Sequence, residues 1–245
     1  MYWSIFMSQN DVKVFLPCRA GSERVPHKNT RPFAEWQHGL LELKLTALEK
    51  ATGISQIILD SNDEKVLEYG RSRKSNWSGT AELYVQERPN HLGLSSTTTD
   101  ALIQYALDNL QEGHLLWTHV TSPFLGHEEY ERIIQAFFQQ KDQGYDSLMT
   151  VNRLQTFLWD EQQPMNYDRD QLKWPRTQDV KPVFEVNSGA FLVPVDIAKT
   201  RQDRIGHKPY LFELNHIEAF DVDWPDDFTM AELLWQSKSQ QRSHG

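Results

Sequence analysis

The 245-residue sequence contains a single cysteine, Cys18, and one thiol makes neither an intrachain disulfide nor a cysteine-based zinc site. Low cysteine usage is typical of a reducing compartment, so we expect a cytoplasmic protein. No apolar run approaches the roughly 18 residues that a membrane-spanning helix needs. The apolar segment before Met7 is short and has no basic residues ahead of it, so we do not interpret it as a signal peptide. Whether translation begins at Met1 or at Met7 stays open.

Positive charge is also scarce, because 25 Lys and Arg residues oppose 34 Asp and Glu residues and the formal net charge is −9. Nucleic-acid binding requires clustered cations that neutralise phosphates, so we exclude a general nucleic-acid-binding protein, although not a small basic pocket. The nine histidines show no zinc-binding spacing, and no GxSxG, P-loop or GxGxxG motif occurs. Zinc hydrolases, serine hydrolases and dinucleotide-binding enzymes are therefore not indicated.

The sequence does contain a repeated alternation of short apolar segments and amphipathic segments. Strands are expected at 12–17, 57–59, 82–86, 115–120 and 147–151, and helices at about 40–48, 64–73, 99–110 and 128–140. Such alternation is typical of right-handed βαβ units, so we predict one α/β domain with a mostly parallel sheet. Ligands of such sheets bind beyond the carboxyl ends of the strands, which directs attention to the residues that follow each strand.

The alternation stops over 152–186, a polar stretch rich in Gln, Asp and Pro. We interpret this stretch as an insertion that forms a lid or a dimer arm. Strand character returns at 189–195, 212–214 and 219–222, and a last helix is expected from Pro225 to about Trp235. The polar tail, 237–245, is expected to be frayed.

Three cations, Arg19, Arg24 and Lys28, fall within ten residues directly after the first expected strand. Gly21 and Ser22 permit a tight turn whose backbone N–H groups form an anion-binding nest. Polyphosphates are bound by such backbone donors together with charged side chains. The loop is therefore a candidate phosphate site, and a solvated basic loop is the alternative.

Asp221 and Asp223 are separated by one residue at the end of a late expected strand. Alternate strand residues point to the same side, so these two carboxylates can converge on one hard cation such as Mg²⁺. Asp226 and Asp227 follow at a helix start, where acidic residues are common. The alternative is that all four acids are helix caps and surface charge.

The end of the central strand also offers polar groups to a ligand, in His119, Thr121 and Ser122. A lone histidine at a strand end is more often part of the structure than of a site. The turn at 187–189 is ordinary turn chemistry when it is taken by itself.

Taken together, these segments resemble the acylneuraminate cytidylyltransferase family, which makes CMP-sialic acids and related CMP-nonulosonates. Residues 18–29, C-R-A-G-S-E-R-V-P-H-K-N, resemble the family's opening A-R-x-G-S-K-R-[IL]-P-x-K-N. Residues 221–227, D-V-D-W-P-D-D, resemble its metal-binding D-x-D followed by a helix. Shorter matches lie in the right order at 61–64, 88–95, 119–123 and 187–191, so the resemblance covers about 12–235.

The resemblance implies a three-layer Rossmann-like nucleotide-diphospho-sugar transferase fold that activates an acidic 2-keto sugar with CTP and releases pyrophosphate. It also implies Mg²⁺ as cofactor and a homodimer that uses the insertion at 152–186 as its arm. The implied catalytic residues are Arg19 and Lys28 on the triphosphate, with Asp221 and Asp223 as metal ligands. The implied nucleotide-binding residues are Arg19, Ala20, Gly21, Ser22, Arg24, Lys28, Asn29, Thr99 and His119. The implied sugar-binding residues are Arg176, Gln178 and Asn187, of which Arg176 is equally a candidate surface charge or dimer contact.

Two alternatives remain open. Glu23 stands where the family has Lys, and His119 stands where it has Gln. These departures motivate a related nucleotidyltransferase with a changed base or sugar, either CMP-Kdo-like or a sugar-1-phosphate guanylyltransferase. The other alternative is a non-catalytic nucleotide-binding relative. The presence of both Asp221 and Asp223 argues against it.

Overall fold

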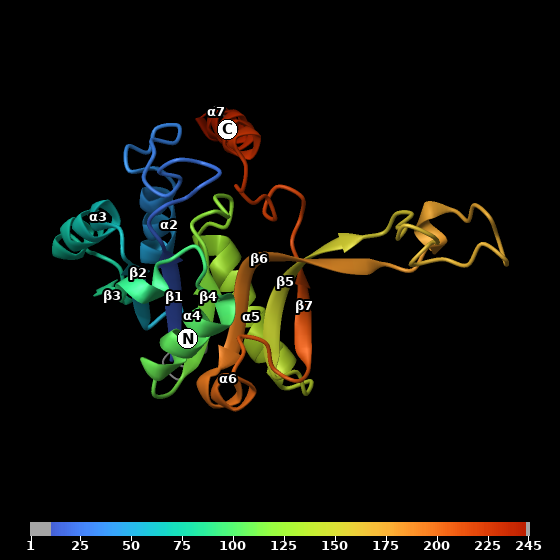
Figure 1. Ribbon diagram of the computed structural model, residues 1–245, viewed down its shortest axis with the longest axis horizontal. Coiled ribbons are helices and arrows are strands. Elements are labelled where there is room, and N and C mark those ends of the chain that lie inside the picture. Colours follow the sequence, from blue (N-terminus) through green and yellow to red (C-terminus); the bar gives the residue numbers. More distant parts are fainter. Residues whose placement is uncertain (1–10, 244–245) are drawn as a thin grey trace.

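The computed structural model describes residues 11–243, in which helices cover both faces of a seven-stranded sheet (Figure 1). The candidate start residues Met1 and Met7 lie outside this range. The strands are β1 (Val12–Cys18), β2 (Gln56–Ser61), β3 (Glu82–Glu87), β4 (His114–Thr118), β5 (Ser147–Leu154), β6 (Val183–Pro194) and β7 (Pro209–Glu213). The helices are α2 (Gly39–Lys50), α3 (Glu64–Ser75), α4 (Thr99–Asp108), α5 (His127–Lys141), α6 (Val195–Arg201) and α7 (Pro225–Ser243), with short 3₁₀ turns η2 (Asn90–Leu92) and η3 (Thr177–Asp179).

The strand order is β3-β2-β1-β4-β6-β5-β7. The first four strands of this order are mutually parallel, as are β5 and β7, whereas β6 is antiparallel to both of its neighbours. The predicted α/β fold with a mostly parallel sheet is therefore confirmed. The carboxyl ends of β1, β2, β3 and β4 meet at one edge, where the topology places a ligand site.

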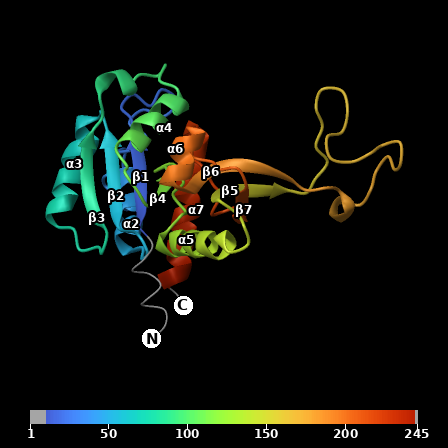
Figure 2. The ribbon, with the colours of Figure 1, turned by 90° about the horizontal axis from the view of Figure 1, so that it is seen from below.

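The core has two layers because β1 supplies apolar side chains to both faces of the sheet. Val14 and Leu16 belong to the cluster under α2, α5 and α7, whereas Phe15 belongs to the cluster under α4 and α6. Figure 2 shows the sheet between these two groups of helices. Burial on both faces explains why β1 is a continuous apolar run rather than an alternating one.

β5 and β6 continue beyond the sheet as a hairpin, and the chain between them forms an arm that projects from the body (Figure 1). The insertion at 152–186 thus begins and ends as strand and is irregular between, apart from η3. Asn166 holds the irregular part together, because its Nδ2 donates to Thr156 O at 2.8 Å and to Lys181 O at 2.9 Å. This side chain is the buried polar centre of a segment that has little apolar core of its own.

Two expectations for the C-terminal region are wrong. The segment 219–222 is not a strand, because Asn215 Oδ1 accepts from the backbone N–H groups of Ile217 and Glu218 and starts a turn instead. α7 continues to Ser243, through most of the tail that was expected to be frayed. No Gly or Pro follows Trp235 until Gly245, so nothing in the sequence ends the helix earlier. Across residues 11–243, no helix combines the length and the apolar character that a bilayer crossing requires.

Gly39 provides a test of the packing between the first loop and α2. Gly39 has φ +63°, and a Cβ there would overlap the Arg31 carbonyl oxygen. Gly21 has φ +71°, but a Cβ at this position would meet no atom within 4 Å. We expect Gly39→Ala to lower the free energy of unfolding by more than about 2 kcal/mol and Gly21→Ala by about 1–2 kcal/mol. Urea denaturation measures both, and equal losses would contradict the packing described.

Candidate nucleotide and metal site

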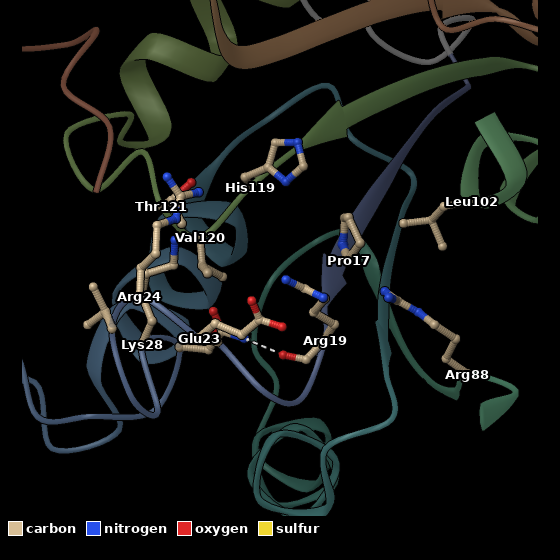
Figure 3. Close-up of a pocket in the computed structure, with 13 residues that line it drawn as sticks. Pro17, Arg19, Glu23, Arg24, Lys28, Arg88, Leu102, His119, Val120 and Thr121 are labelled. Atoms are coloured by element: carbon tan, nitrogen blue, oxygen red, sulfur yellow. Dashed lines mark hydrogen bonds between the residues drawn. The ribbon is translucent and has the colours of Figure 1, made fainter. Parts of the chain in front are cut away.

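A cavity of about 440 Å³ opens at the carboxyl ends of β1, β3 and β4 (Figure 3). It combines cations from separate segments, since Arg19, Arg24 and Lys28 come from the loop after β1 and Arg88 follows β3. Glu23 is the acidic residue among those that line it. The remaining lining residues are Pro17, Ser22, Val25, Asn29, Leu102, His119, Val120 and Thr121. An acidic chain thus concentrates positive charge at the edge where its parallel strands end.

The loop after β1 is shaped by contacts of its own backbone. Gly21 adopts the left-handed φ that the predicted tight turn requires. Asn29 Nδ2 donates to Arg19 O at 3.2 Å, and Ala20 N donates to Asn62 Oδ1 at 2.9 Å. The Ala20 N–H is therefore occupied, which leaves the predicted anion nest to the N–H groups of Gly21 and Ser22. Within residues 11–243 the Arg19 guanidinium has no acceptor, so it is available to a ligand.

Lys28 joins this loop to the predicted metal site. Its Nζ donates to Val222 O at 2.9 Å and lies 3.3 Å from Asp223 Oδ1, and Arg24 reaches the same carboxylate oxygen at 3.2 Å. Val222 N donates in turn to Thr121 O at 2.8 Å, just beyond β4. The candidate phosphate loop and the candidate metal ligands are therefore parts of one site.

Asp221 and Asp223, the candidate ligands of a hard cation, lie close enough for their charges to interact. Burial is the main cause that raises the pKa of Asp221, and the negative charge of Asp223 raises it further, while a hydrogen bond from Thr121 and the charge of Lys28 lower it. Residues 11–243 hold no cluster of three or more His, Cys, Asp or Glu side chains arranged for a metal. A cation here would take two carboxylates from the protein and its other ligands from phosphate oxygens and water, which is the usual Mg²⁺ arrangement.

Lys44 positions the loop that carries Thr121, and its role was not predicted from the sequence. This fully buried side chain donates from Nζ to Ser122 O at 2.9 Å, to Leu125 O at 3.2 Å and to the Tyr130 hydroxyl at 2.6 Å. Burial lowers the pKa of Lys44 to about 7. The sequence feature that could have indicated this role is a lysine among the leucines of the buried face of α2. The same pattern is also compatible with a lysine whose aliphatic part packs on the core while its ammonium group reaches water.

His119 is held as a neutral ring. Trp117 Nε1 donates to His119 Nε2 at 3.0 Å, and because an indole N–H only donates, the proton of the imidazole resides on Nδ1. Burial, reinforced by the charges of Arg204, Lys44 and Lys28, lowers the pKa of His119 to about 3. At neutral pH this cavity residue is therefore an uncharged donor rather than an acid.

Arg88 lines the cavity and was not predicted as part of the site. Its side chain is 2% exposed, and it donates from Nε to Asp60 Oδ2 at 2.5 Å and from a second nitrogen to Asp60 O at 3.1 Å. Burial raises the pKa of Asp60, and the charge of Arg88 opposes that shift. The pair fixes a guanidinium at the edge of the cavity without leaving a buried charge unpaired. The sequence feature that could have indicated Arg88 is the R-P segment at 88–95, which resembles a family motif.

The predicted residues outside this cluster are dispersed. Thr99 lies exposed in the first turn of α4 and does not line the cavity, whereas Leu102, one turn later, does. Arg176 and Gln178 belong to the arm between β5 and β6, which projects from the body (Figure 1); neither lines the cavity, and Arg176 is highly exposed. Asn187 lies at the base of the arm and donates to Asn152 Oδ1 at 2.9 Å. One chain therefore does not bring the predicted sugar-binding residues together.

The raised pKa of Asp221 makes a stability prediction. The ionised carboxylate destabilises the fold as pH rises through the folded-state pKa, and this penalty is absent at acid pH, where the carboxyl group is protonated in both states. We therefore expect Asp221→Asn to raise the melting temperature at pH 7, with a difference that disappears towards about pH 3.

Asp226→Asn is the matched control. Asp226 is exposed in the first turn of α7, where the helix dipole favours a carboxylate, so its loss leaves the melting temperature unchanged or lower. Scanning calorimetry between pH 3 and about pH 8 makes the comparison. A lower melting temperature of Asp221→Asn at pH 7 would show that the carboxylate is not penalised.

Comparison with known proteins agrees with this geometry. The family model described as cytidylyltransferase matches residues 14–243. Two curated relatives, the pseudaminic acid cytidylyltransferases of two strains of Campylobacter jejuni subsp. jejuni, are each 23% identical over 232 residues, which is 90% of this chain and 94% of theirs.

Solved structures are similar in fold. A CMP:2-keto-3-deoxy-manno-octonic acid synthetase complexed with CTP matches with a TM-score of 0.63 and 12% identity, over 94% of this chain and 100% of that one. The 4-diphosphocytidyl-2C-methyl-D-erythritol synthase of Anaerococcus prevotii matches with a TM-score of 0.66 and 12% identity, over 95% of this chain and 99% of that one. These similarities show an α/β fold of the three-layer Rossmann-like type.

Proposed function

Since the chain belongs to the cytidylyltransferase family, we propose that it transfers CMP from CTP to an acidic nonulosonic sugar and releases pyrophosphate. A hydroxyl oxygen of the sugar attacks the α-phosphorus, the bond from the α-phosphorus to the bridging oxygen of the β-phosphate breaks, and the hydroxyl proton is lost. The observation that carries the proposal is that three loop cations line one cavity, and that two of them, Arg24 and Lys28, also contact Asp223 of the candidate metal pair. The names of the two Campylobacter relatives support a nonulosonic acid as acceptor.

The basic and the acidic residues of the site have different roles. Arg19, Arg24 and Lys28 bind the triphosphate and stabilise the negative charge that develops on the leaving pyrophosphate. Asp221 and Asp223 would hold Mg²⁺, which would supply Lewis-acid stabilisation of phosphate charge. The ion pair between Asp223 and Arg24 is exposed and therefore weak, and that between Asp223 and Lys28 is exposed on the Asp223 side, so we expect phosphate to replace the carboxylate as partner.

His119 suits recognition of a base by hydrogen bonding. With Nε2 occupied by Trp117, its Nδ1–H is the donor left for a ligand, and a cytosine carbonyl is a fitting acceptor. Leu102 and Pro17 provide apolar surface on the same cavity wall. Burial raises the pKa of the Cys18 thiol to about 12, so this side chain is unreactive. We place the enzyme in the cytoplasm, where CTP is available.

The direct test is pyrophosphate release by the purified chain with CTP, pseudaminic acid or N-acetylneuraminic acid, and Mg²⁺. We expect turnover that requires all three, and a loss of at least about 100-fold in Asp223→Asn, because removing one charge-stabilising group has effects of this size. Asp226→Asn, an exposed acid in the first turn of α7 that makes no ion pair with Arg24 or Lys28 among residues 11–243, serves as the matched control and retains turnover.

Four other outcomes would overturn parts of the proposal. Turnover with GTP in place of CTP would indicate a guanylyltransferase, and turnover only with an eight-carbon acidic sugar would indicate the CMP-Kdo-like alternative. Full activity of Asp223→Asn would remove the metal assignment. No pyrophosphate release, together with a melting-temperature rise on addition of CTP, would indicate a non-catalytic nucleotide-binding protein.

The arm supports the further proposal of a homodimer. Trp159, Met165, Leu172 and Trp174 are large apolar side chains on the arm, each 45% exposed or more. Such a group on a projecting segment is typical of an interface. The arm also carries Arg176 and Gln178 away from the cavity of its own chain, which leaves a second copy as the site that they can reach.

A charge on the arm should dissociate this dimer. We expect Leu172→Glu to convert a dimer to a monomer, because the substitution places a carboxylate in an apolar interface. Size-exclusion chromatography with light scattering measures the mass. Leu233→Glu, at a similarly exposed apolar position on α7, is the control and stays dimeric. A monomeric parent chain, or a dimer that tolerates Leu172→Glu, would contradict the assignment.

A further inference from the structure

Glu23 is an acidic side chain in the cation-rich cavity, and the proposed chemistry leaves it without a role. Of the residues between 11 and 243 that line this cavity, it is the only acid. It shares the cavity with the guanidinium groups of Arg19, Arg24 and Arg88 and with the Lys28 ammonium. Figure 3 shows its carboxylate pointing into the cavity. A negative charge thus stands where the surrounding charges favour a negatively charged ligand.

The fold makes no use of this carboxylate. The Glu23 side chain is exposed and has no hydrogen bond or ion pair within the described part of the chain. Asp223, by contrast, pairs with Arg24 and Lys28. Surface side chains without a partner contribute little to stability, so we expect the charge of Glu23 to act on a ligand rather than on the fold.

The loop that carries Glu23 also offers free backbone donors. The N–H groups of Gly21, Ser22 and Glu23 find no acceptor among residues 11–243. Successive free N–H groups in a turn bind anions such as phosphate. A phosphate held by them lies beside the Glu23 side chain, because the last of these donors belongs to the same residue.

Repulsion between like charges weakens the binding of such a phosphate. Two like unit charges in contact lower an affinity by roughly 5-fold in water, and by more where the surroundings are less polar. The effect grows with the charge of the ligand, so it is large for a triphosphate and for pyrophosphate. A cavity rich in cations attracts both, and tight retention of a product slows turnover wherever product release limits the rate. The carboxylate offsets part of that attraction.

We infer that Glu23 sets the affinity of the cavity for polyphosphates: its carboxylate weakens the binding of pyrophosphate and of the triphosphate, and thereby speeds release of the product. The role is electrostatic, because the side chain holds no other described residue in place. Glu23 is not a catalytic residue but one that adjusts the balance between binding and release. The inference rests on the proposed function for the identity of the leaving group.

The test changes the charge at this position without changing the fold. Glu23→Gln removes the charge and keeps the size of the side chain, and Glu23→Lys reverses the charge. Glu82→Gln is the matched control, because Glu82 is exposed at the amino end of β3, on the opposite edge of the sheet. Each full-length chain is titrated calorimetrically with pyrophosphate alone and with CTP alone, without Mg²⁺, at about 0.1 M and about 1 M salt.

We expect Glu23→Gln to lower the Kd for pyrophosphate by about 5- to 10-fold at the lower salt concentration, and Glu23→Lys to lower it further. CTP follows in the same direction. Both gains shrink at about 1 M salt, where the screening length is only about 3 Å. In turnover assays, inhibition by pyrophosphate strengthens in both variants, while the KM for the sugar stays within about twofold of the parent value. Glu82→Gln behaves like the parent chain.

Any of three results would overturn the inference. Equal or weaker binding of pyrophosphate by Glu23→Gln would show that the carboxylate does not repel the ligand. A gain that persists undiminished at high salt would show that the effect is not one of charge. A gain of the same size in Glu82→Gln would show that it is not local to the cavity.

Failure of the proposed function gives a different result. A parent chain that binds pyrophosphate but forms no CMP-sugar with any acidic sugar rejects that function, while the comparison with Glu23→Gln still decides the inference. Absence of pyrophosphate binding in both chains overturns the inference, because the carboxylate then has no phosphate to repel.

Discussion

The hydrogen bond from the Lys28 ammonium to the carbonyl of Val222 is the contact on which the site depends, because it joins segments 194 residues apart. Without it the loop after β1 and the carboxylates before α7 would be separate features of the surface. The ammonium also faces Asp223, so positive and negative groups are held at one edge before any ligand binds. An arrangement of this kind reduces the reorganisation that binding and catalysis require.

Two buried cations keep the surrounding loops in place. Lys44 supplies three donors to two backbone carbonyls and a tyrosine hydroxyl, and Arg88 is paired with Asp60. Each takes a charge out of water, which is unfavourable unless every polar group finds a partner. Lys44 donates to carbonyl groups of the loop after β4, which lacks regular backbone pairing, whereas Arg88 donates to the backbone and side chain of Asp60 near the end of β2.

Much of the fold was predictable because its signals are local. Continuous apolar runs marked β1 and β4, and the expected helix at 64–73 agrees with α3. The cation loop and the Asp221 and Asp223 pair were recognisable because their residues are close in sequence. Failures came where a local pattern was ambiguous. The short apolar segment at 219–222 has the composition of a strand, but Asn215 directs the preceding chain into a turn.

The sequence by itself determined the class of the fold, the charged loop, the carboxylate pair and the position of the insertion, since each depends on neighbouring residues and on strand or helix periodicity. Only the tertiary structure decided that β6 enters antiparallel between β4 and β5, that Lys44 and Arg88 support the site, and that the arm carries Arg176 away from the cavity. These features depend on pairings between residues far apart in the chain. Periodicity carries no record of such pairings, because the same lysine or arginine is equally compatible with a solvated surface until its partners are in place.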